Sequence, residues 1–417
     1  MSAPDKLTDW LFYLFLLVVT ASSFSIALTQ SALALALVIF LTIIVWQRYQ
    51  PFVRSLRWFY LAVAIYVGWM IISAICGQTP LSSLSGAKEE WLFLIIPVVI
   101  SLAQDEKKLN WLLTALSVGV ILVAAYTAFQ FFTRVDTVRM SGNFSHALTY
   151  GNYSATAALF LLGFVMVGSG SLKRWQRWLI MFGGVAAVAG TVMGNSRSPI
   201  VAMFVGLLLL LLFAGKKWRW LVLAVVAAVI VTVLASDQIR ERFTPTDTRS
   251  GIERNLGTYW QGSRRFVWEN SLKIIREHPV IGIGAGNFCK VYQETVGPEL
   301  HPIHLYGHSH NDFLNITVHT GIPGGLCFAG LWLTALIYFW YGYRRSERES
   351  FHRRTSAAGL LASLVFLATS LTEATFADEE VRTLLMFVWA VGLSGWYKQL
   401  DSTNSPTRHS RSLTENI

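Results

Sequence analysis

Charged residues are scarce in this chain. Only 14% of its 417 residues are Asp, Glu, Lys or Arg, whereas 53% are hydrophobic. A soluble domain carries roughly 25% charged residues, and the apolar residues here stand in long runs, without the alternation of a barrel strand. Only helices and closed barrels satisfy their own backbone hydrogen bonds inside a bilayer. The composition therefore excludes a soluble globular protein and predicts an all-α, polytopic integral membrane protein.

Cysteine is rare as well, and familiar metal and nucleotide motifs are missing. The three cysteines are Cys76, Cys289 and Cys327. Their spacing matches neither a metal site nor a disulfide framework, and the helical His-Glu-x-x-His pair that holds zinc is absent. The cluster Gly282, Gly284 and Gly286 follows no predicted strand, so it is weak evidence for a phosphate-binding loop. A cysteine-held metal and a nucleotide fold are both disfavoured.

What the chain does contain is about twelve apolar runs, each long enough to cross a bilayer, which takes about 20 helical residues. They begin near Trp10, Ser31, Trp58, Trp91, Asn110, Asn152, Trp178, Pro199, Trp218, Phe313, Thr355 and Val381. The chain accordingly divides into membrane helices 1–9 (residues 1–235), one large loop (236–311), membrane helices 10–12 (312–398) and a tail (399–417). The tail is rich in Ser, Thr and Asn, a composition typical of disorder.

The distribution of cations predicts how the chain crosses the membrane. Every second connection is rich in Lys and Arg, beginning with Arg48–Arg57 and ending with Arg344–Arg354. By the positive-inside rule both termini are cytoplasmic, and the loop 236–311 lies on the outer, periplasmic side. The net charge of +10 therefore follows from orientation and requires no nucleic-acid partner. Within the outer loop, Arg264–Glu277 predicts an amphipathic helix with Trp268, Leu272 and Ile275 on one face.

A group of histidines closes the large loop. They are His301, His304, His308 and His310. Pro302 and Gly307 favour a loop there, and His310 is the best candidate for chemistry because Asn311 and then an apolar run follow it directly. An imidazole, with an ordinary pKa near 6.5, can accept a proton at neutral pH. We favour a solvated loop with one working histidine, and a metal site stays the alternative.

Arginines on the predicted outer side form a second signal. Arg197 stands in a very short turn between two apolar runs, and Arg264 and Arg265 open the amphipathic helix. Guanidinium groups bind phosphate through paired donors, so several of them beside a base suggest a phosphorylated lipid as ligand. A snorkelling anchor at Arg197 and a solvated helix face at Arg264 and Arg265 are the structural alternatives. Lys88, in another outer loop, could add a phosphate contact.

Two further features complete the set of candidates. A polar and aromatic group before the sixth run suits sugar contacts, although it could equally cap a helix; it comprises Arg139, Ser141, Asn143, His146, Tyr150, Gly151 and Asn152. Glu373 lies inside an apolar run. An acid in such a position is either a buried, hydrogen-bonded group or part of a functional site, and the sequence leaves both readings open.

Three of these motifs together resemble a known family. His310-Asn311, followed after nine residues by Gly321-x-x-Gly324, looks like the signature of bacterial O-antigen ligases, which finish lipopolysaccharide. The Arg197 turn resembles the family's arginine motif, with Val201 where the family has leucine. The stretch from Arg264 to Gly284 is similar to the loop of the wider ligase and polymerase superfamily.

The resemblance implies a function. A glycan would be transferred from undecaprenyl diphosphate to a hydroxyl of a lipid A-core sugar, with inversion and without metal or other cofactor, at the periplasmic face of the bacterial inner membrane. His310 would be the base. The diphosphate would be bound by Arg197, Arg264 or its neighbour Arg265, and Lys88, while contacts to the glycan or the acceptor are expected from His146, Tyr150, Asn311 and His308.

Other functions remain open at this stage. An O-antigen polymerase would use the same donor with a second lipid-linked glycan as acceptor, and a ligase could use protein acceptors. A transporter of lipid-linked sugars would also need many membrane helices and cations. Its ionisable groups would lie near the bilayer midplane, whereas those of this chain cluster in the outer loops.

Overall fold

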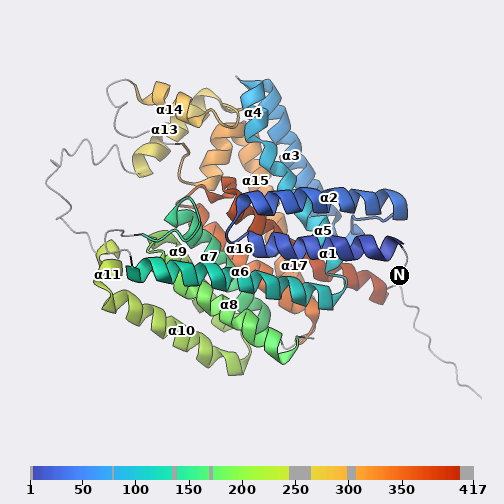
Figure 1. Ribbon diagram of the computed structural model, residues 1–417. Helices are drawn as coiled ribbons and strands as arrows, with labels where there is room; N and C mark the ends of the chain where they lie inside the picture. Colours follow the sequence, from blue (N-terminus) through green and yellow to red (C-terminus); the bar gives the residue numbers. More distant parts are fainter. Residues whose placement is uncertain are drawn as a thin grey trace, which may run out of the picture.

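The computed structural model describes residues 3–77, 79–133, 139–168, 172–243, 264–297 and 307–403. Over these ranges the chain forms a bundle of helices and contains no strand, which confirms the predicted all-α class (Figure 1). His301 and His304 lie outside the described residues, as does most of the predicted tail.

The helices follow one another along the chain with short connections. The first half consists of α1 (Ala3–Ala21), α2 (Ile26–Gln47), η1 (Arg54–Leu56), α3 (Arg57–Cys76), α4 (Pro80–Gly86), η2 (Lys88–Leu94), α5 (Ile95–Leu102), α6 (Glu106–Thr133), α7 (Ala147–Met166) and α8 (Arg174–Met193). The second half consists of α9 (Arg197–Phe213), α10 (Lys216–Ala235), α11 (Asp237–Phe243), α13 (Arg264–Glu277), α14 (Phe288–Val296), α15 (Asp312–Arg345), α16 (Phe351–Ser370), η4 (Thr375–Ala377) and α17 (Glu379–Thr403).

Each of the twelve predicted apolar runs begins inside one of these helices. Six helical segments of the described chain are long and apolar enough to cross a membrane: Ile26–Gln47, Arg54–Cys76, Glu106–Thr133, Arg174–Met193, Lys216–Ala235 and Asp312–Arg345. A shorter apolar helix, Arg197–Phe213, stands between two of them. The chain is a multi-pass membrane protein, and the number twelve stays a prediction.

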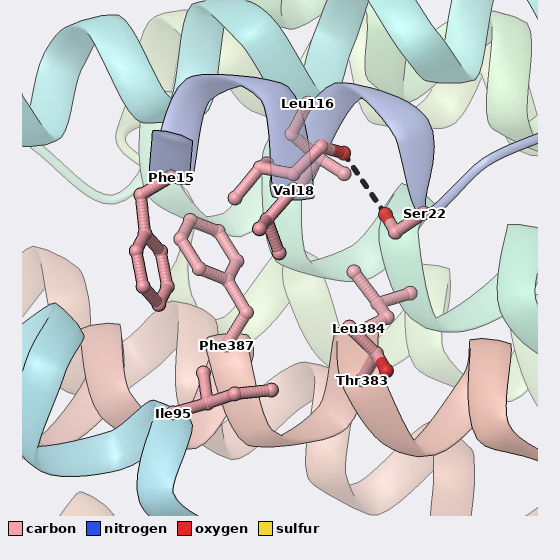
Figure 2. Close-up of a pocket in the computed structure, with 9 residues that line it drawn as sticks. Phe15, Val18, Ser22, Ile95, Leu116, Thr383, Leu384 and Phe387 are labelled. Carbon is pink, nitrogen blue, oxygen red and sulfur yellow. Dashed lines mark hydrogen bonds between the residues drawn. The ribbon is translucent and has the colours of Figure 1, made fainter. Parts of the chain in front are cut away.

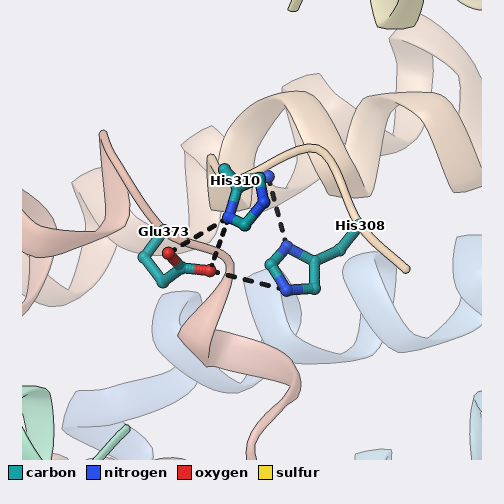
Figure 3. Close-up of side chains that lie close together, drawn as sticks. All are labelled: His308, His310 and Glu373. Carbon is teal, nitrogen blue, oxygen red and sulfur yellow. Dashed lines mark hydrogen bonds and ion pairs between the residues drawn. The ribbon is translucent and has the colours of Figure 1, made fainter. Parts of the chain in front are cut away.

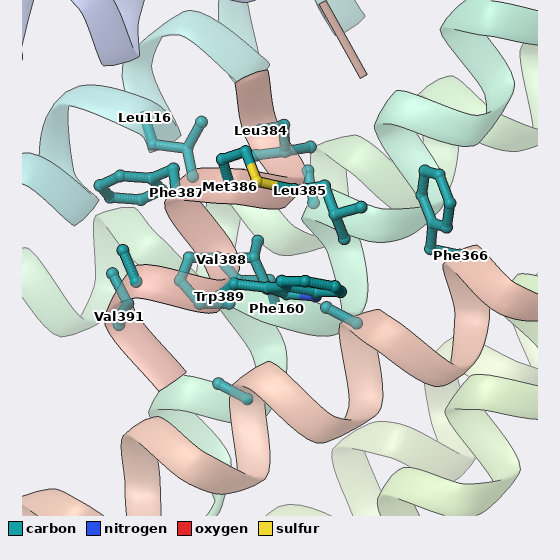
Figure 4. Close-up of a cluster of buried hydrophobic side chains, with 14 of the residues drawn as sticks. Leu116, Phe160, Phe366, Leu384, Leu385, Met386, Phe387, Val388, Trp389 and Val391 are labelled. Carbon is teal, nitrogen blue, oxygen red and sulfur yellow. The ribbon is translucent and has the colours of Figure 1, made fainter. Parts of the chain in front are cut away.

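The centre of the bundle is formed by α7, α16 and α17. Every residue of α7 from 149 to 166 is buried, including polar ones such as Asn152 and Thr156. Figure 4 shows Phe160 of α7, Phe366 of α16 and Trp389 of α17 as members of one cluster of buried side chains. The ring of Trp389 is fully buried and meets Trp332 of α15 edge to face at 4.9 Å. Peripheral helices such as α2 and α10 expose many large apolar side chains, as lipid-facing helices do.

A small space inside the bundle is too narrow for a substrate. It lies among α1, α5, α6 and α17 and is lined mainly by apolar side chains, including Phe15, Leu116 and Phe387 (Figure 2). Its volume is about 10 Å³, which is about the room of one water molecule. The hydroxyl of Ser22 at its edge donates to the carbonyl of Val19, 2.9 Å away.

Polar bonds tie several helix ends together at one end of the bundle. The hydroxyl of Thr149 donates to Asp378 Oδ2 at 2.8 Å, connecting the start of α7 to the segment before α17. The hydroxyls of Ser198 and Thr372 lie 2.5 Å apart and connect the start of α9 to the end of α16. These helix ends belong to connections that the charge pattern assigns to one side of the membrane.

The long helix α15 is interrupted at Gly321, which has φ +73° and ψ 178°, with Pro323 two residues later. The interruption releases backbone carbonyls, and neighbouring segments bind three of them. The amides of Ile283 and Gly284 donate to Val318 and His319 at 3.1 and 2.9 Å, and Trp69 Nε1 donates to Thr320 at 2.8 Å.

The glycines of the outer loop therefore have a structural role. Gly282 and Gly284 have φ of +73° and +79°, and the backbone beside them rests against the break in α15. A Cβ on Gly282 would stand 2.5 Å from the backbone of His319, and one on Gly321 would stand 2.1 Å from the carbonyl oxygen of Val280. Two glycine motifs far apart in sequence thus allow one close contact between backbones.

The predicted amphipathic helix is α13, and its bounds are those expected, Arg264–Glu277. Its buried face was predicted wrongly in part. Leu272 is 48% exposed, whereas Val267, Ser271, Ile274 and Ile275 are buried. Val267, Ile274 and Ile275 join a small apolar cluster with Phe288 and other residues of α14 and with Val318 of α15. In Figure 1, α13 and α14 accordingly lie together, apart from the bundle of α6 to α10.

Candidate active site

His310 stands immediately before α15 in a constrained stretch of backbone. Its φ is +50°, a left-handed conformation that is uncommon for a residue with a side chain. Asn311 then caps the helix, because its Oδ1 accepts from the amide of Leu314 at 2.9 Å. The Nδ2 of Asn311 donates to the carbonyl of Leu371 at 3.1 Å. The predicted acceptor contact Asn311 therefore has both ends of its amide engaged in holding the chain near His310.

The ring of His310 is bound to Glu373. His310 Nδ1 lies 2.9 Å from Glu373 Oε1 and 3.1 Å from Oε2 (Figure 3). Because an ionised carboxylate can only accept, Nδ1 carries the proton in this pair. The basic lone pair of the neutral imidazole is then on Nε2. The pair has the arrangement of a general base with an orienting acid.

His308 lies against the same carboxylate. Its Nδ1 accepts from the backbone amide of His310 at 3.2 Å, and its Nε2 lies 3.5 Å from Glu373 Oε1 (Figure 3). Burial lowers the pKa of His308, Glu373 opposes this effect, and the neighbouring imidazoles of His310 and His146 and the guanidinium of Arg264 lower the pKa further. His308 is therefore neutral at pH 7, with its proton on Nε2, toward the carboxylate.

Glu373 is the buried centre of this group, with 6% of its surface exposed. Burial by itself raises the pKa of a carboxyl, but the hydrogen bond from His310 and the electrostatic effects of His310, His308 and Arg264 outweigh it. The net effect lowers the pKa of Glu373 below 4.5. Arg264 Nη2 lies 3.5 Å from Glu373 Oε2. The carboxylate stays ionised at neutral pH and gathers three donors.

The connection that carries Glu373 is anchored by another acid, Asp312. The hydroxyl of Ser370 donates to Asp312 Oδ2 at 2.6 Å, and the amide of Phe376 donates to Oδ1 at 2.9 Å. Both anchors are fully buried or nearly so. Since Asp312 is two residues from His310, the start of α15 fixes the histidine and the connection that holds its partner.

The predicted phosphate-binding residues are distributed unequally around this group. Arg264, 44% exposed, reaches Glu373, whereas Arg265 Nε pairs with Glu269 on its own helix at 3.0 Å. Arg197 begins α9 and is exposed, and no bond holds it to another residue of the described ranges. Its neighbour Ser198 touches Thr372, next to Glu373. Arg197 thus begins its helix beside the group.

Lys88 and the predicted glycan contacts also differ in how they lie relative to the His310–Glu373 pair. No bond joins Lys88 to this group in the described part of the chain. His146 is exposed just before α7 and is close enough to His308 to contribute to the lowering of the pKa of His308. Tyr150 is fully buried against Phe144, so its ring offers no surface to a sugar. The expected glycan contact by Tyr150 is therefore wrong, because Tyr150 faces the core of the bundle, whereas its neighbours in the preceding loop face outward.

Three side chains of this group could in principle hold a metal ion. One ligand atom each from His308, His310 and Glu373 lies within 4.8 Å of the others. Ligands of a tetrahedral zinc ion stand roughly 3.3 Å apart, whereas His310 Nδ1 and Glu373 Oε1 are at the hydrogen-bond distance of 2.9 Å. The geometry is that of a hydrogen-bonded pair, and the metal alternative is left to the experiment below.

Comparison with known proteins identifies the segment that carries His310 and the arginines. Residues 182–329 match the family model of the O-antigen ligases. The matched segment contains Arg197, Arg264, His308 and His310. The resemblance seen in the sequence is thereby confirmed for this segment.

A curated relative extends the similarity without adding a function. It is an uncharacterized protein of Haemophilus influenzae, 24% identical over 261 residues. The alignment covers 60% of this chain and 64% of the relative. The chain therefore matches slightly less than two thirds of that protein's length.

Glu373 lies outside the matched O-antigen ligase segment, and the sequence left its role undecided. The available signal was an acid within an apolar run. Its pairing with His310, 63 residues earlier, depends on how α16 returns to the start of α15. Local sequence does not contain that information.

Proposed function

We propose that this protein is an O-antigen ligase. It transfers a polysaccharide from undecaprenyl diphosphate to a hydroxyl of a lipid A-core sugar, on the periplasmic side of the bacterial inner membrane, with inversion and without a metal. The observation that carries the proposal is the His310–Glu373 pair with Arg264 on the same carboxylate. A base and a phosphate-binding cation at one site suit the attack of a hydroxyl on a sugar whose leaving group is a diphosphate.

In the proposed mechanism His310 Nε2 takes the proton of the acceptor hydroxyl as its oxygen attacks the anomeric carbon. The new glycosidic bond forms on the face opposite the bond to the diphosphate, which breaks. Glu373 holds Nδ1–H and stabilises the imidazolium that forms, as the carboxylate does in a hydrolase triad. General base catalysis of this kind contributes about 10²–10⁴-fold.

The leaving diphosphate needs donors that are already in position. Arg264, on the carboxylate, and Arg197, at the start of α9, supply guanidinium groups on the open side of the site. Preorganised donors stabilise charge that develops in the transition state, and the paired donors of arginine match phosphate oxygens. The diphosphate bond itself drives the transfer, so neither ATP nor a nucleotide sugar is required.

An apolar groove supports a lipid-linked donor. It has a volume of about 620 Å³ and runs between α9, α15 and α16, with walls that include Leu212, Leu336 and Leu364. Arg197 begins α9 and His310 precedes α15. The groove lies toward the other ends of these two helices, near Phe213 and Arg344. It therefore suits the far part of a long polyprenyl chain whose headgroup is at the His310 site.

A deletion strain tests this function. The host gene is removed, and the lipids and lipopolysaccharide of the cells are compared by gel and mass spectrometry. Loss of capped lipopolysaccharide with accumulation of unattached polymer on lipid diphosphate supports a ligase. Accumulation of single repeat units would instead indicate a polymerase, and normal capping would overturn the proposal.

A further inference from the structure

A second cavity, separate from the His310–Glu373 pair, lies at the end of the bundle where the helix ends are bonded together. Its volume is about 450 Å³, within the range of small-molecule sites. It is lined by the turn between α1 and α2, the first residues of α2, the loop before α7 and the first turn of α17, namely Ser22, Ser23, Phe24, Ser25, Ile26, Ala27, Asn143, Phe144, Ser145 and Glu380.

The side chains around this cavity suit a hydroxyl-rich ligand. Asn143 supplies a donor and an acceptor, Ser145 supplies both in one hydroxyl, and the carboxylate of Glu380 accepts. Asn143 and Ser145 are exposed, and their side chains bond to no other residue of the described chain. Phe24, 38% exposed, adds an apolar ring. The lining contains one carboxylate and no cation, so a phosphate or an anionic headgroup would be repelled.

The walls are held rigidly, which lowers the entropy lost on binding. Ser22 and Ser23 bond to the hydroxyl of Tyr153 at 3.0 and 2.9 Å. The ring of Tyr153 packs on Phe144 at 5.0 Å between centroids. The loop before α7 is held to α6 by two hydrogen bonds, both 3.0 Å long, between the backbone of Gly142 and the side chain of Gln130.

The cavity is continuous in sequence with the His310 site through two segments. The loop that supplies Asn143 and Ser145 ends at His146, which is near enough to His308 to influence it electrostatically. The connection that carries Glu373 leads to the first turn of α17 and Glu380. Asp378, between these two acids, bonds to Thr149 near the start of α7.

We propose that this cavity binds a sugar residue of a glycan while another part of that glycan occupies the His310 site. The ligand is a neutral sugar, held by hydrogen bonds to Asn143, Ser145 and Glu380 and by contact with Phe24. It comes from either the transferred polysaccharide or the acceptor core. The assignment of these two sources rests on the proposed function; the sugar-binding cavity itself does not.

Two tryptophan substitutions one residue apart test the cavity. Ala27→Trp fills it, whereas Leu28→Trp, on the adjacent exposed residue that does not line it, is the matched control. Binding of free core oligosaccharide and of free repeat-unit oligosaccharide to the purified proteins is followed by saturation-transfer NMR. We expect one of the two to bind wild type and Leu28→Trp, and to bind Ala27→Trp about 10-fold more weakly or worse, as the loss of two hydrogen bonds allows.

The oligosaccharide that binds identifies the source of the sugar, and Asn143→Ala is expected to weaken the same one. Equal binding by wild type and Ala27→Trp, or binding of neither probe by wild type, would overturn the inference. Failure of the proposed function is a different result: His310→Ala would retain transfer activity, or wild type would show none, while the NMR signal still depended on Ala27.

Discussion

At the scale of single residues, the account depends on the carboxylate of Glu373, which meets donors from His310, His308 and Arg264. Glu373→Gln removes its charge and leaves one acceptor oxygen for three donors. We expect kcat to fall by about 10²–10⁴-fold, with little change in KM for either lipid substrate, because Glu373 is proposed to act through the base and not on the substrates.

The matched control is Glu379→Gln, since Glu379 bonds to Gln30 and not to a histidine. Steady-state transfer rates of the two variants, purified at equal folding yield, give the comparison. If Glu373→Gln kept the wild-type kcat, the carboxylate would be an anchor of the loop and have no part in the chemistry.

Asp378 leads to a prediction about pH and stability. Burial raises the pKa of Asp378 from 3.8 to about 7, and the charges of Glu380, Glu373 and Glu89 oppose the lowering effect of its bond from Thr149. Between these two pH values the folded state keeps a proton that the unfolded state releases, so stability falls as pH rises. Asp378→Asn should therefore raise the melting temperature at pH 8 and have little effect at pH 4. An equal shift at both pH values would contradict this sign.

Local sequence was sufficient to single out some site residues and insufficient for others. His310 and Arg264 stand in motifs with loop or helix-start signals, and the structure brings both to one carboxylate. Tyr150 stands in an equally polar stretch but points into the core. Its neighbour His146, one helical turn earlier, is exposed. Where burial begins along this stretch depends on the helices and the loop packed around α7, and no spacing within the stretch reveals this.

At the scale of elements, the break in α15 is the feature that joins the outer loop to the bundle. Gly321→Ala places a Cβ 2.1 Å from the carbonyl oxygen of Val280 and forces an alanine to φ +73°. We expect loss of the folded protein or a large drop in melting temperature. Gly330→Ala, on the same helix with nothing within 4 Å of the added Cβ, should be tolerated. Scanning fluorimetry in detergent compares the two variants. Similar melting temperatures would show that the contact between the outer loop and the break in α15 does not contribute to stability.

The helix α13 shows how far periodicity alone can lead. Its ends were predicted correctly, and Pro279 follows its last residue closely, at a position where proline commonly ends a helix. The buried stripe was misjudged because it packs on α14 and Val318 of α15, which makes the covered face pass through Val267 and Ser271. Leu272 was left outside. Tertiary packing, and not the apolar pattern, decided the face.

At the scale of the whole molecule, a buried ion pair connects distant parts of the bundle. Arg382 of α17, 3% exposed, bonds to Glu90 of η2 and lies over the ring of Phe376 at 4.4 Å. Removal of one partner of a buried pair costs about 3–5 kcal/mol. Arg382→Met should therefore destabilise strongly, and Glu90→Gln in the same chain should restore most of the loss. Denaturant unfolding of single and double variants measures this coupling, and additive effects would exclude it.

The overall architecture followed from the sequence because hydropathy dictates it. Every predicted apolar run begins inside a helix, and the bonds among helix ends unite connections assigned to one side. The sequence did not reveal which helices are central, because the apolar runs of α7, α16 and α17 look like those of their lipid-facing neighbours. Burial of their polar residues, such as Ser363 against Trp389, became apparent only in the assembled bundle.

The central claim is that His310, held by Glu373, is a metal-independent base for glycan transfer. Its most direct test is transfer in proteoliposomes that contain purified protein, a defined glycan on undecaprenyl diphosphate and a lipid A-core acceptor, with and without EDTA. The account predicts that wild type forms capped lipid equally well in EDTA, and that His310→Ala, folded normally, loses about 10²-fold or more of the rate. Wild-type transfer by His310→Ala, or a loss in EDTA that zinc restores, would contradict it.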